Sequence, residues 1–410
     1  MVGICRWQGH AGNRTMKTKL KLAVKGLVSP FLNQKLTRYK SRQTCKESFV
    51  ATVKPTEAGV DIFAGPASFK MRVVDGDWVE PEVYDFAIFG LAALSLSNGW
   101  KITAEMPVST SMIKKVDEIT NVYKLWSIDK LSKLRIDLPI AGTEGLSSRG
   151  LGRLVCLSGG VDSTFAAICA HEAGDLDGCL LIAGADYPDA SHKGFIELRK
   201  RVSAIASAFG SKLTTVETTI RQSRFEWEMM HGFNLASCLH YLSGTYKSGG
   251  IGLDNTLAQD VVRNPWGNNA ALPYLFSTDR FSIKGFGEFA NRVSKIKKIH
   301  EFDSSLFDTM SICWANITIG GNCGHCRKCI GMRLALFALG ISDKSMFVSH
   351  PDLIDAIDHL KVSNSLSAVK GQLVRTAEIV DALPDGPVRS RLSEFERAVR
   401  HRYFLLDPFR

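Results

Sequence analysis

The stretch that decides the fold is Leu154-Val-Cys-Leu-Ser-Gly-Gly-Val-Asp-Ser-Thr-Phe-Ala-Ala167. The apolar run at residues 153–157 predicts a short buried strand, and the pattern at residues 164–173 predicts a helix soon after it. Between them, Gly159 and Gly160 allow a tight turn in which no Cβ blocks the backbone. A strand, a glycine turn and a helix start in this order arrange free backbone N–H groups around a concavity. That arrangement binds phosphate.

Hydroxyl groups flank the two glycines, because Ser158 precedes them and Ser163 follows. Both can add hydrogen bonds to a bound phosphate. No Lys-Ser or Lys-Thr pair follows the glycines, so this is not the common kinase-type P-loop, and Mg²⁺ and cations from elsewhere must balance the phosphate charge. The alternative is an ordinary strand–turn–helix in which Asp162 and Ser163 only cap the helix.

The alternation of strands and helices continues beyond this segment. Strands are predicted at residues 178–183, 212–218 and 249–253, and helices at residues 195–209 and 229–246. Strands that alternate with helices of this length predict an α/β fold with a doubly wound parallel sheet.

Four parts are predicted along the chain. They are a basic N-terminal arm at residues 1–45, an α+β accessory domain at 46–149, the domain of the phosphate loop at 150–310, and a four-cysteine segment with a helical C-terminal region at 311–410. Strands in hairpins and one helix, at residues 83–96, are expected in the accessory domain. A Gly/Ser-rich stretch at residues 142–150 marks the boundary between the two domains.

Positive charge is concentrated in the arm. The chain has 51 Lys and Arg against 41 Asp and Glu, a formal net charge of +10. Residues 1–45 hold ten of the basic side chains and no acidic one, so the rest of the chain is neutral. Nucleic-acid binding, if present, is therefore expected in the arm alone, and a solvated or partner-docking tail is the ordinary alternative.

Composition points to a folded cytoplasmic protein. The chain is 45% hydrophobic and 22% charged, which excludes a disordered or collagen-like chain. The longest strongly apolar stretch, at residues 86–96, is shorter than the roughly 18 residues that a membrane span needs. No apolar block follows the N-terminal charges, so a secretory signal is not predicted.

Four of the ten cysteines gather in one short segment as Cys313-x9-Cys323-x2-Cys326-x2-Cys329. Such a spacing can place four thiolates at the corners of a tetrahedron. Zn²⁺ is the metal ion that such a four-thiolate site ordinarily binds. An iron–sulfur cluster is the rival, although the bacterial ferredoxin run expects a cysteine where Arg333 stands. Four unligated thiols are the remaining alternative.

The Ser-Gly-Gly-Val-Asp-Ser segment resembles the SGGxDS signature of the N-type ATP pyrophosphatases, the PP-loop enzymes. The resemblance implies adenylation, in which the loop holds the pyrophosphate end of ATP while a substrate oxygen attacks the α-phosphate. It assigns ATP binding to Ser158, Gly159, Gly160, Asp162 and Ser163.

Within that group, the combination of this loop with a C-terminal four-cysteine cluster resembles that of the 7-cyano-7-deazaguanine synthases (QueC). Gly232 and Asn234 match a Gly-Arg-Asn segment of that family, but Phe233 replaces the arginine, and a Tyr-Pro-Asp-Cys segment before the cluster is missing. The resemblance covers about residues 150–335. The extra N-terminal part, Pro265-Trp-Gly267 and the Arg292-x-x-Lys295 pair look more like the QueC-like members of bacterial anti-phage (Qat-type) defence systems.

Further site candidates follow the predicted strands, where open α/β sheets bind ligands. Asp186 follows the second strand and is predicted to help bind the nucleotide, with a solvated turn as the alternative. Asp254 and Asp260 follow the fourth strand and can hold Mg²⁺ or a base edge, with plain loop aspartates as the alternative.

Three further candidates lie on predicted helices. Arg292 and Lys295 share a helix face and can supply the missing cations, against the alternative of a solvated basic helix. His231 can assist proton transfer, and a structural histidine is the alternative.

The leading hypothesis is an ATP-dependent enzyme that adenylates a 7-carboxy-7-deazaguanine-like carboxylate and passes it to an amine. The resemblance implies ATP, Mg²⁺ and Zn²⁺ as cofactors, a deazapurine substrate, and ammonia or a partner protein of the same defence system as acceptor. A PP-loop enzyme that modifies tRNA or DNA and a non-catalytic nucleotide-binding scaffold are the alternatives.

Overall fold

The computed structural model describes residues 47–57, 59–126, 134–139, 150–223, 226–315 and 321–407. The predicted arm at residues 1–45 lies outside the described residues, and so does the boundary segment except for Gly150. No helix in the described part of the chain is long and apolar enough to cross a membrane.

Ten strands form one sheet in the order β10-β9-β6-β7-β8-β3-β2-β1-β4-β5. Six of the nine strand pairings are parallel, which confirms the predicted α/β class with a mostly parallel sheet. The strands are β1 (Ser48–Thr56), β2 (Gly59–Ala64), β3 (Ala67–Asp75), β4 (Lys101–Ala104), β5 (Ile136–Asp137), β6 (Leu151–Cys156), β7 (Leu176–Ala183), β8 (Lys212–Thr218), β9 (Tyr246–Gly252) and β10 (Ser282–Phe286).

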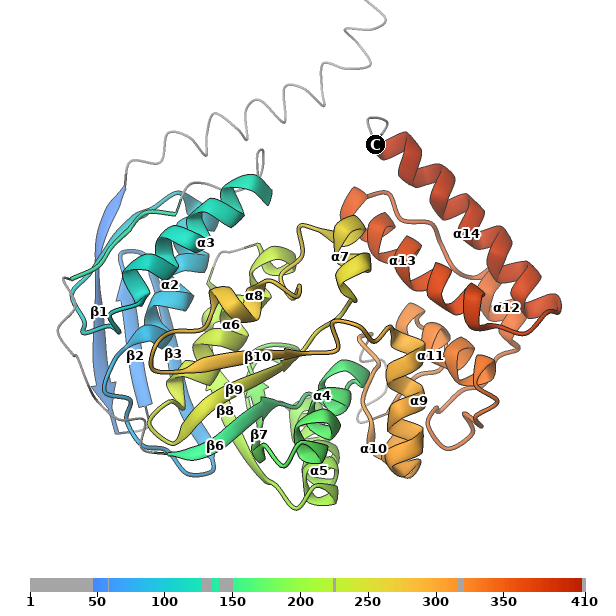
Figure 1. Cartoon of the computed structure of the whole chain (residues 1–410), viewed down its shortest axis with the longest axis horizontal. Helices are drawn as coiled ribbons and strands as arrows, with labels where there is room; N and C mark the ends of the chain where they lie inside the picture. Colours follow the sequence, from blue (N-terminus) through green and yellow to red (C-terminus); the bar gives the residue numbers. More distant parts are fainter. Residues whose placement is uncertain are drawn as a thin grey trace, which may run out of the picture.

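Helices cover both faces of the sheet (Figure 1). Side chains along β6 alternate between two cores, because Leu154 and Cys156 belong to the core that includes α2 and α6, whereas Val155 belongs to the core that includes α4 and α5. The longer helices are α2 (Asp85–Asn98), α3 (Met112–Trp126), α4 (Val161–Glu172), α5 (Lys193–Ala208), α6 (Trp227–Tyr241), α9 (Arg292–Asp303), α11 (Arg327–Ala338), α13 (Leu366–Ala382) and α14 (Pro387–Leu406). The shorter ones are η1 (Ile220–Gln222), α7 (Leu257–Arg263), α8 (Leu272–Leu275), α10 (Leu306–Thr309) and α12 (Leu353–Asp358).

The sheet runs without a break from the phosphate-loop part into the N-terminal hairpins. Strand β3 pairs antiparallel with β8, so that Met71 lies opposite Thr218 and Val73 opposite Val216. The two parts also share a hydrophobic core, in which Phe86 of α2 and Phe233 of α6 are both fully buried. Residues 46–149 and 150–310 are therefore joined by backbone pairing as well as by side-chain contacts.

The order of the central strands locates the edge where a ligand is expected. From β6 the chain steps to β7 and β8 on one side, and then crosses to β9 and β10 on the other side of β6. Open α/β sheets bind ligands where the strand order reverses in this way, at the carboxyl ends of the strands. Here that point lies between β6 and β9. The C-terminal helices α11 and α13 lie beside α9 at the end of the molecule opposite the hairpins (Figure 1).

Candidate functional site

The glycine turn leads directly from β6 into α4. Gly159 has φ +77°, a left-handed conformation that suits glycine, and Gly160 is the residue at the N-cap of α4. No side chain accepts a hydrogen bond at this cap. The first backbone N–H groups of α4 are thus left for a ligand or water.

Ser163 braces the turn from inside the first helical turn. Its hydroxyl accepts a hydrogen bond from the backbone N–H of Ser158 at 3.1 Å, lies 3.1 Å from the Ser158 hydroxyl, and donates to the carbonyl of Gly160 at 3.1 Å. Neither Asp162 nor Ser163 is the capping residue, because α4 begins at Val161. The simple capping interpretation does not describe this turn.

Two predicted cations meet at Asp162. Lys295 Nζ lies 2.9 Å from Asp162 Oδ1, and Arg292 Nη2 lies 2.8 Å from Asp162 Oδ2. The Lys295 side chain is 0% exposed and also donates to the carbonyl of Leu253 at 2.5 Å. Both basic side chains come from the first turn of α9, so the predicted shared face is turned toward the loop and not toward solvent.

Asp254 lies two residues beyond β9, at the switch point. Its carboxylate accepts hydrogen bonds from Trp266 Nε1 at 2.8 Å and from Asn268 Nδ2 at 3.3 Å. Burial alone would raise its pKa, but the charges of Arg375 and His231, the Trp266 bond and the charge of Arg292 outweigh burial and lower it to about 2. Asp254 therefore stays ionised near neutral pH.

His231 lies beside Trp266 and Asp254. Its ring lies against Trp266, with a centroid distance of 5.1 Å, and its Nδ1 lies 3.2 Å from the carbonyl of Trp227. Burial lowers the pKa of His231, while the nearby Asp254 acts in the opposite direction. The neutral form of the ring is thus favoured, as a proton acceptor requires.

Both carboxylate oxygens of Asp260 are hydrogen-bonded to groups of its own neighbouring segments. One carboxylate oxygen accepts from Asn255 Nδ2 at 3.1 Å, the other accepts from the backbone N–H of Ala270 at 2.9 Å, and burial raises its pKa. Mg²⁺ binds the ionised form of a carboxylate, which the lowered pKa of Asp254 favours more than the raised pKa of Asp260, so Asp254 is the better candidate of the pair.

The remaining predicted residues are spread more widely. Asp186 is 74% exposed, and its one ion-pair contact among the described residues is Arg221 at 4.0 Å. Asn234 is buried in α6, and its amide has no hydrogen-bond partner in the described part of the chain. Phe233, where the QueC-type segment has arginine, packs its ring against Phe276 at 5.0 Å inside the core. That position contributes no charge to the site.

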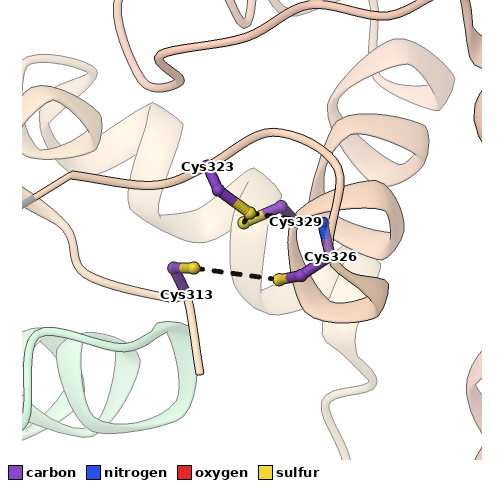
Figure 2. Close-up of side chains that lie close together, drawn as sticks. All are labelled: Cys313, Cys323, Cys326 and Cys329. Atoms are coloured by element: carbon purple, nitrogen blue, oxygen red, sulfur yellow. Dashed lines mark hydrogen bonds between the residues drawn. The ribbon is translucent and has the colours of Figure 1, made fainter. Parts of the chain in front are cut away.

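The four predicted cysteines come together. All four Sγ atoms lie within 4.8 Å of one another, with Cys313 and Cys326 3.9 Å apart and Cys323 and Cys329 3.8 Å apart. Figure 2 shows the four side chains pointing toward one another. Sulfurs of a tetrahedral site with metal–sulfur bonds of about 2.3 Å lie about 3.8 Å apart. The group can therefore hold a metal ion, and no other such group of His, Cys, Asp and Glu occurs among the described residues.

The backbone around the cysteines is built for close approach. Gly324 has φ +83°, and a Cβ there would come within 1.8 Å of the Ser349 carbonyl. Asn322 is buried and joins three segments, because it accepts from the N–H groups of Ile312 and Cys313 and donates to the carbonyls of Met310 and Met346. The backbone positions of Cys313 and Cys323 are thus tied to neighbouring segments by Asn322.

One hydrogen bond links the cluster to the phosphate loop. The backbone N–H of Ser311, two residues before Cys313, donates to the carbonyl of Gly159 at 2.9 Å. Cys313 and the glycine turn are therefore connected through two residues of chain and one backbone hydrogen bond.

Helix α13 supplies charged residues that no sequence motif marked. Glu378 accepts from the backbone N–H of Arg292 at 3.2 Å and from Gln259 Nε2 at 2.8 Å. Arg375 is near enough to Asp254 and Arg292 to shift their pKa values. A helical periodicity indicated α13, but it does not say which helix face meets which partner.

The sequence matches no protein-family model and no curated protein. The resemblance to the PP-loop enzymes therefore rests on the motif residues themselves.

Proposed function

We propose that this chain is an ATP-dependent adenylating enzyme of the PP-loop type, similar to the 7-cyano-7-deazaguanine synthases. The observation that carries the proposal is the uncapped glycine turn at the start of α4, beside which Arg292 and Lys295 hold Asp162. Two cations against one carboxylate leave one positive charge at the helix start, where a polyphosphate needs it.

The proposed substrate is a carboxylic acid of the 7-carboxy-7-deazaguanine type. A carboxylate oxygen attacks the α-phosphorus of ATP, the bond from that phosphorus to its bridging oxygen breaks, and pyrophosphate leaves. An amine nitrogen then attacks the acyl carbon, AMP leaves, and the amine loses a proton to give an amide. A second ATP and loss of water would convert a primary amide into a nitrile. The amine is ammonia, or a group on a partner protein of a bacterial defence system.

The chain's own residues suit both the adenylation and the amine attack. The uncapped N–H groups at the start of α4 and the hydroxyl of Ser158 would bind the phosphates, and Ser163 holds the turn in shape through its bonds to Ser158 and Gly160. Asp254 is the ionised carboxylate at the switch point and would help to hold Mg²⁺, which usually binds through phosphates and one or two carboxylates. The neutral ring of His231 beside it is suited to accept the proton of the attacking amine.

The four cysteines are proposed to hold Zn²⁺ in a structural role. Their sulfur spacing fits a closed tetrahedral site with no free coordination position. Arg327 and Lys328 beside Cys326 would offset the double negative charge of such a centre. The ion would fix Cys313, and with it the Ser311 contact to the phosphate loop.

One assay tests the proposed reaction. The full chain is incubated with ATP, Mg²⁺ and 7-carboxy-7-deazaguanine, with and without ammonia, and AMP, pyrophosphate and new base products are measured by mass spectrometry. We expect AMP and pyrophosphate in equal amounts, and their loss in Ser163→Ala. The matched control is Ser207→Ala, because that hydroxyl is exposed on α5. AMP formation only with RNA would favour a nucleic-acid substrate, and no AMP under any condition would refute adenylation.

A further inference from the structure

A face of α13 points at the proposed ATP site. A Cβ at Gly371 would lie 3.1 Å from the guanidinium carbon of Arg263, so the helix backbone touches that side chain. Seven residues later, Glu378 accepts hydrogen bonds from the Arg292 backbone and from Gln259 of α7. Positions 371, 375 and 378 are four and three residues apart and lie on one helix face. Arg375 is therefore placed between Arg263 and Arg292.

The charges around Arg375 agree with this placement. After burial, the charge of Arg375 is the largest influence that lowers the pKa of Arg263, to about 10, and that lowers the pKa of Arg292. The same charge is the largest that lowers the pKa of Asp254. Three guanidinium groups from α7, α9 and α13 thus converge near the carboxylate of Asp254.

The three arginines differ in what they bind. Arg263 donates to the carbonyl of Ser367 and stacks on Trp266, with the guanidinium carbon 3.7 Å from the ring centroid. Arg292 is paired with Asp162, although its Nε is buried without a partner among the described residues. Arg375 is half-buried and makes no hydrogen bond or ion pair within the described part of the chain. The charge of Arg375 is repelled by Arg263 and Arg292 and attracted by Asp254, but no carboxylate of the described residues contacts its guanidinium.

We infer that Arg375 is an anion-binding residue of the ATP site, whose guanidinium receives an oxyanion beside Arg292. A phosphate of the nucleotide and the carboxylate of the acid each present a pair of anionic oxygens that one guanidinium can bind together. The inference rests on the proposed function for the identity of these two ligands. It adds to that proposal a residue from the C-terminal helices, far from the glycine turn in sequence.

The test compares Arg375→Gln and Arg375→Ala with Arg400→Ala. Arg400→Ala is the matched control, because it removes one guanidinium from the neighbouring helix α14, where Arg400 is 53% exposed and pairs with Glu396. Three quantities are measured on the full chain: the Kd for ATP, the Kd for inorganic pyrophosphate, and the KM for 7-carboxy-7-deazaguanine at saturating ATP. Loss of a charged hydrogen bond should weaken the relevant constant about tenfold or more, while Arg400→Ala should leave all three constants unchanged.

The pattern of change identifies the ligand. Weaker binding of ATP and pyrophosphate assigns Arg375 to a phosphate, and a raised KM with unchanged Kd for ATP assigns it to the carboxylate. Unchanged constants in both folded variants would overturn the inference, even if adenylation occurs. Weaker pyrophosphate binding in a protein that adenylates no acid would uphold the anion site and refute the proposed reaction.

Discussion

Lys295 Nζ lies 2.9 Å from Asp162 Oδ1 with its side chain fully excluded from solvent. A buried ammonium is tolerated only when its charge is compensated, and Asp162 provides that compensation together with the Leu253 carbonyl. Asp162 therefore stabilises the fold beside the glycine turn, apart from any contact that it makes with a ligand.

Replacing Asp162 by Ala should therefore destabilise the fold by about 3–5 kcal/mol, the usual cost of leaving a buried charge unpaired. Urea unfolding measures this loss. Glu172→Ala is the matched control, because its partner Lys298 is 36% exposed and such surface pairs contribute about 1 kcal/mol or less. The double variant Asp162→Asn with Lys295→Met should regain stability but no pyrophosphate release. Equal losses in Asp162→Ala and Glu172→Ala would contradict this account of Lys295.

The cysteine cluster should bind a single zinc ion and stabilise the phosphate turn through it. Metal analysis of purified protein is expected to find zinc in the wild type and none in Cys326→Ser. Cys169→Ser is the control, because that half-buried thiol lies outside the cluster. Removing the metal should also weaken ATP binding, since Ser311 would no longer be fixed against Gly159. A metal-free chain that stays folded and binds ATP normally would show that the two sites are independent.

Stability should fall as the pH decreases from about 6.5 to about 4. Burial lowers the pKa of His240 to about 4, while its ordinary value is near 6.5. Between these values the unfolded chain binds more protons than the folded chain, so up to about 3 kcal/mol of stability is lost on acidification. Burial also lowers the pKa of His231, so its protonation likewise reduces stability as the pH falls.

His240→Phe isolates that contribution, because the ring lies against Phe89 and Phe281, and its one polar contact among the described residues is that of Nε2 with the Phe276 carbonyl at 2.8 Å. Urea unfolding of both proteins at several pH values should give a shallower dependence for the variant. Parallel curves would mean that His240 does not titrate as described.

The two N-terminal parts should respond differently to deletion. Removing residues 1–45 should leave adenylation intact and change only association, because the proposed site lies in the neutral body of the chain. Removing residues 1–149 should prevent folding, because it takes β3 from the edge of β8 and α2 from the shared core. Circular dichroism and AMP formation report both outcomes. A folded, active chain that starts at residue 150 would show that the continuous sheet is dispensable.

Much of the central fold could be predicted because its signals are local. The strand at residues 212–218 has the bounds that the sequence predicted, and the glycine turn lies between strand and helix as its sequence indicated. The four cysteines were found for the same reason, since a metal site with short spacings is written in one stretch of chain.

The features that escaped prediction depend on distant partners. Strand β10 is five residues long and contains Gly285, so its pattern alone does not indicate a strand. The helix predicted at residues 229–246 ends at Tyr241. Tyr246 is already the first residue of β9, where it pairs with Leu151 of β6. Arg375 carries no motif, and only the packing of α13 against α7 and α9 reveals where it lies.

The hydrogen bond from Ser311 to Gly159 can form only late in the synthesis of the chain. A nascent chain leaves the ribosome with β6, the glycine turn and α4 long before α9 and Ser311 emerge. Until then the turn lacks Arg292, Lys295 and the donor to its carbonyl. A translation product that stops before residue 292 carries the whole nucleotide motif without the cations beside it. The proposed ATP site is therefore complete only late in synthesis, because a chain that ends before residue 292 lacks the two cations that the proposal assigns to it.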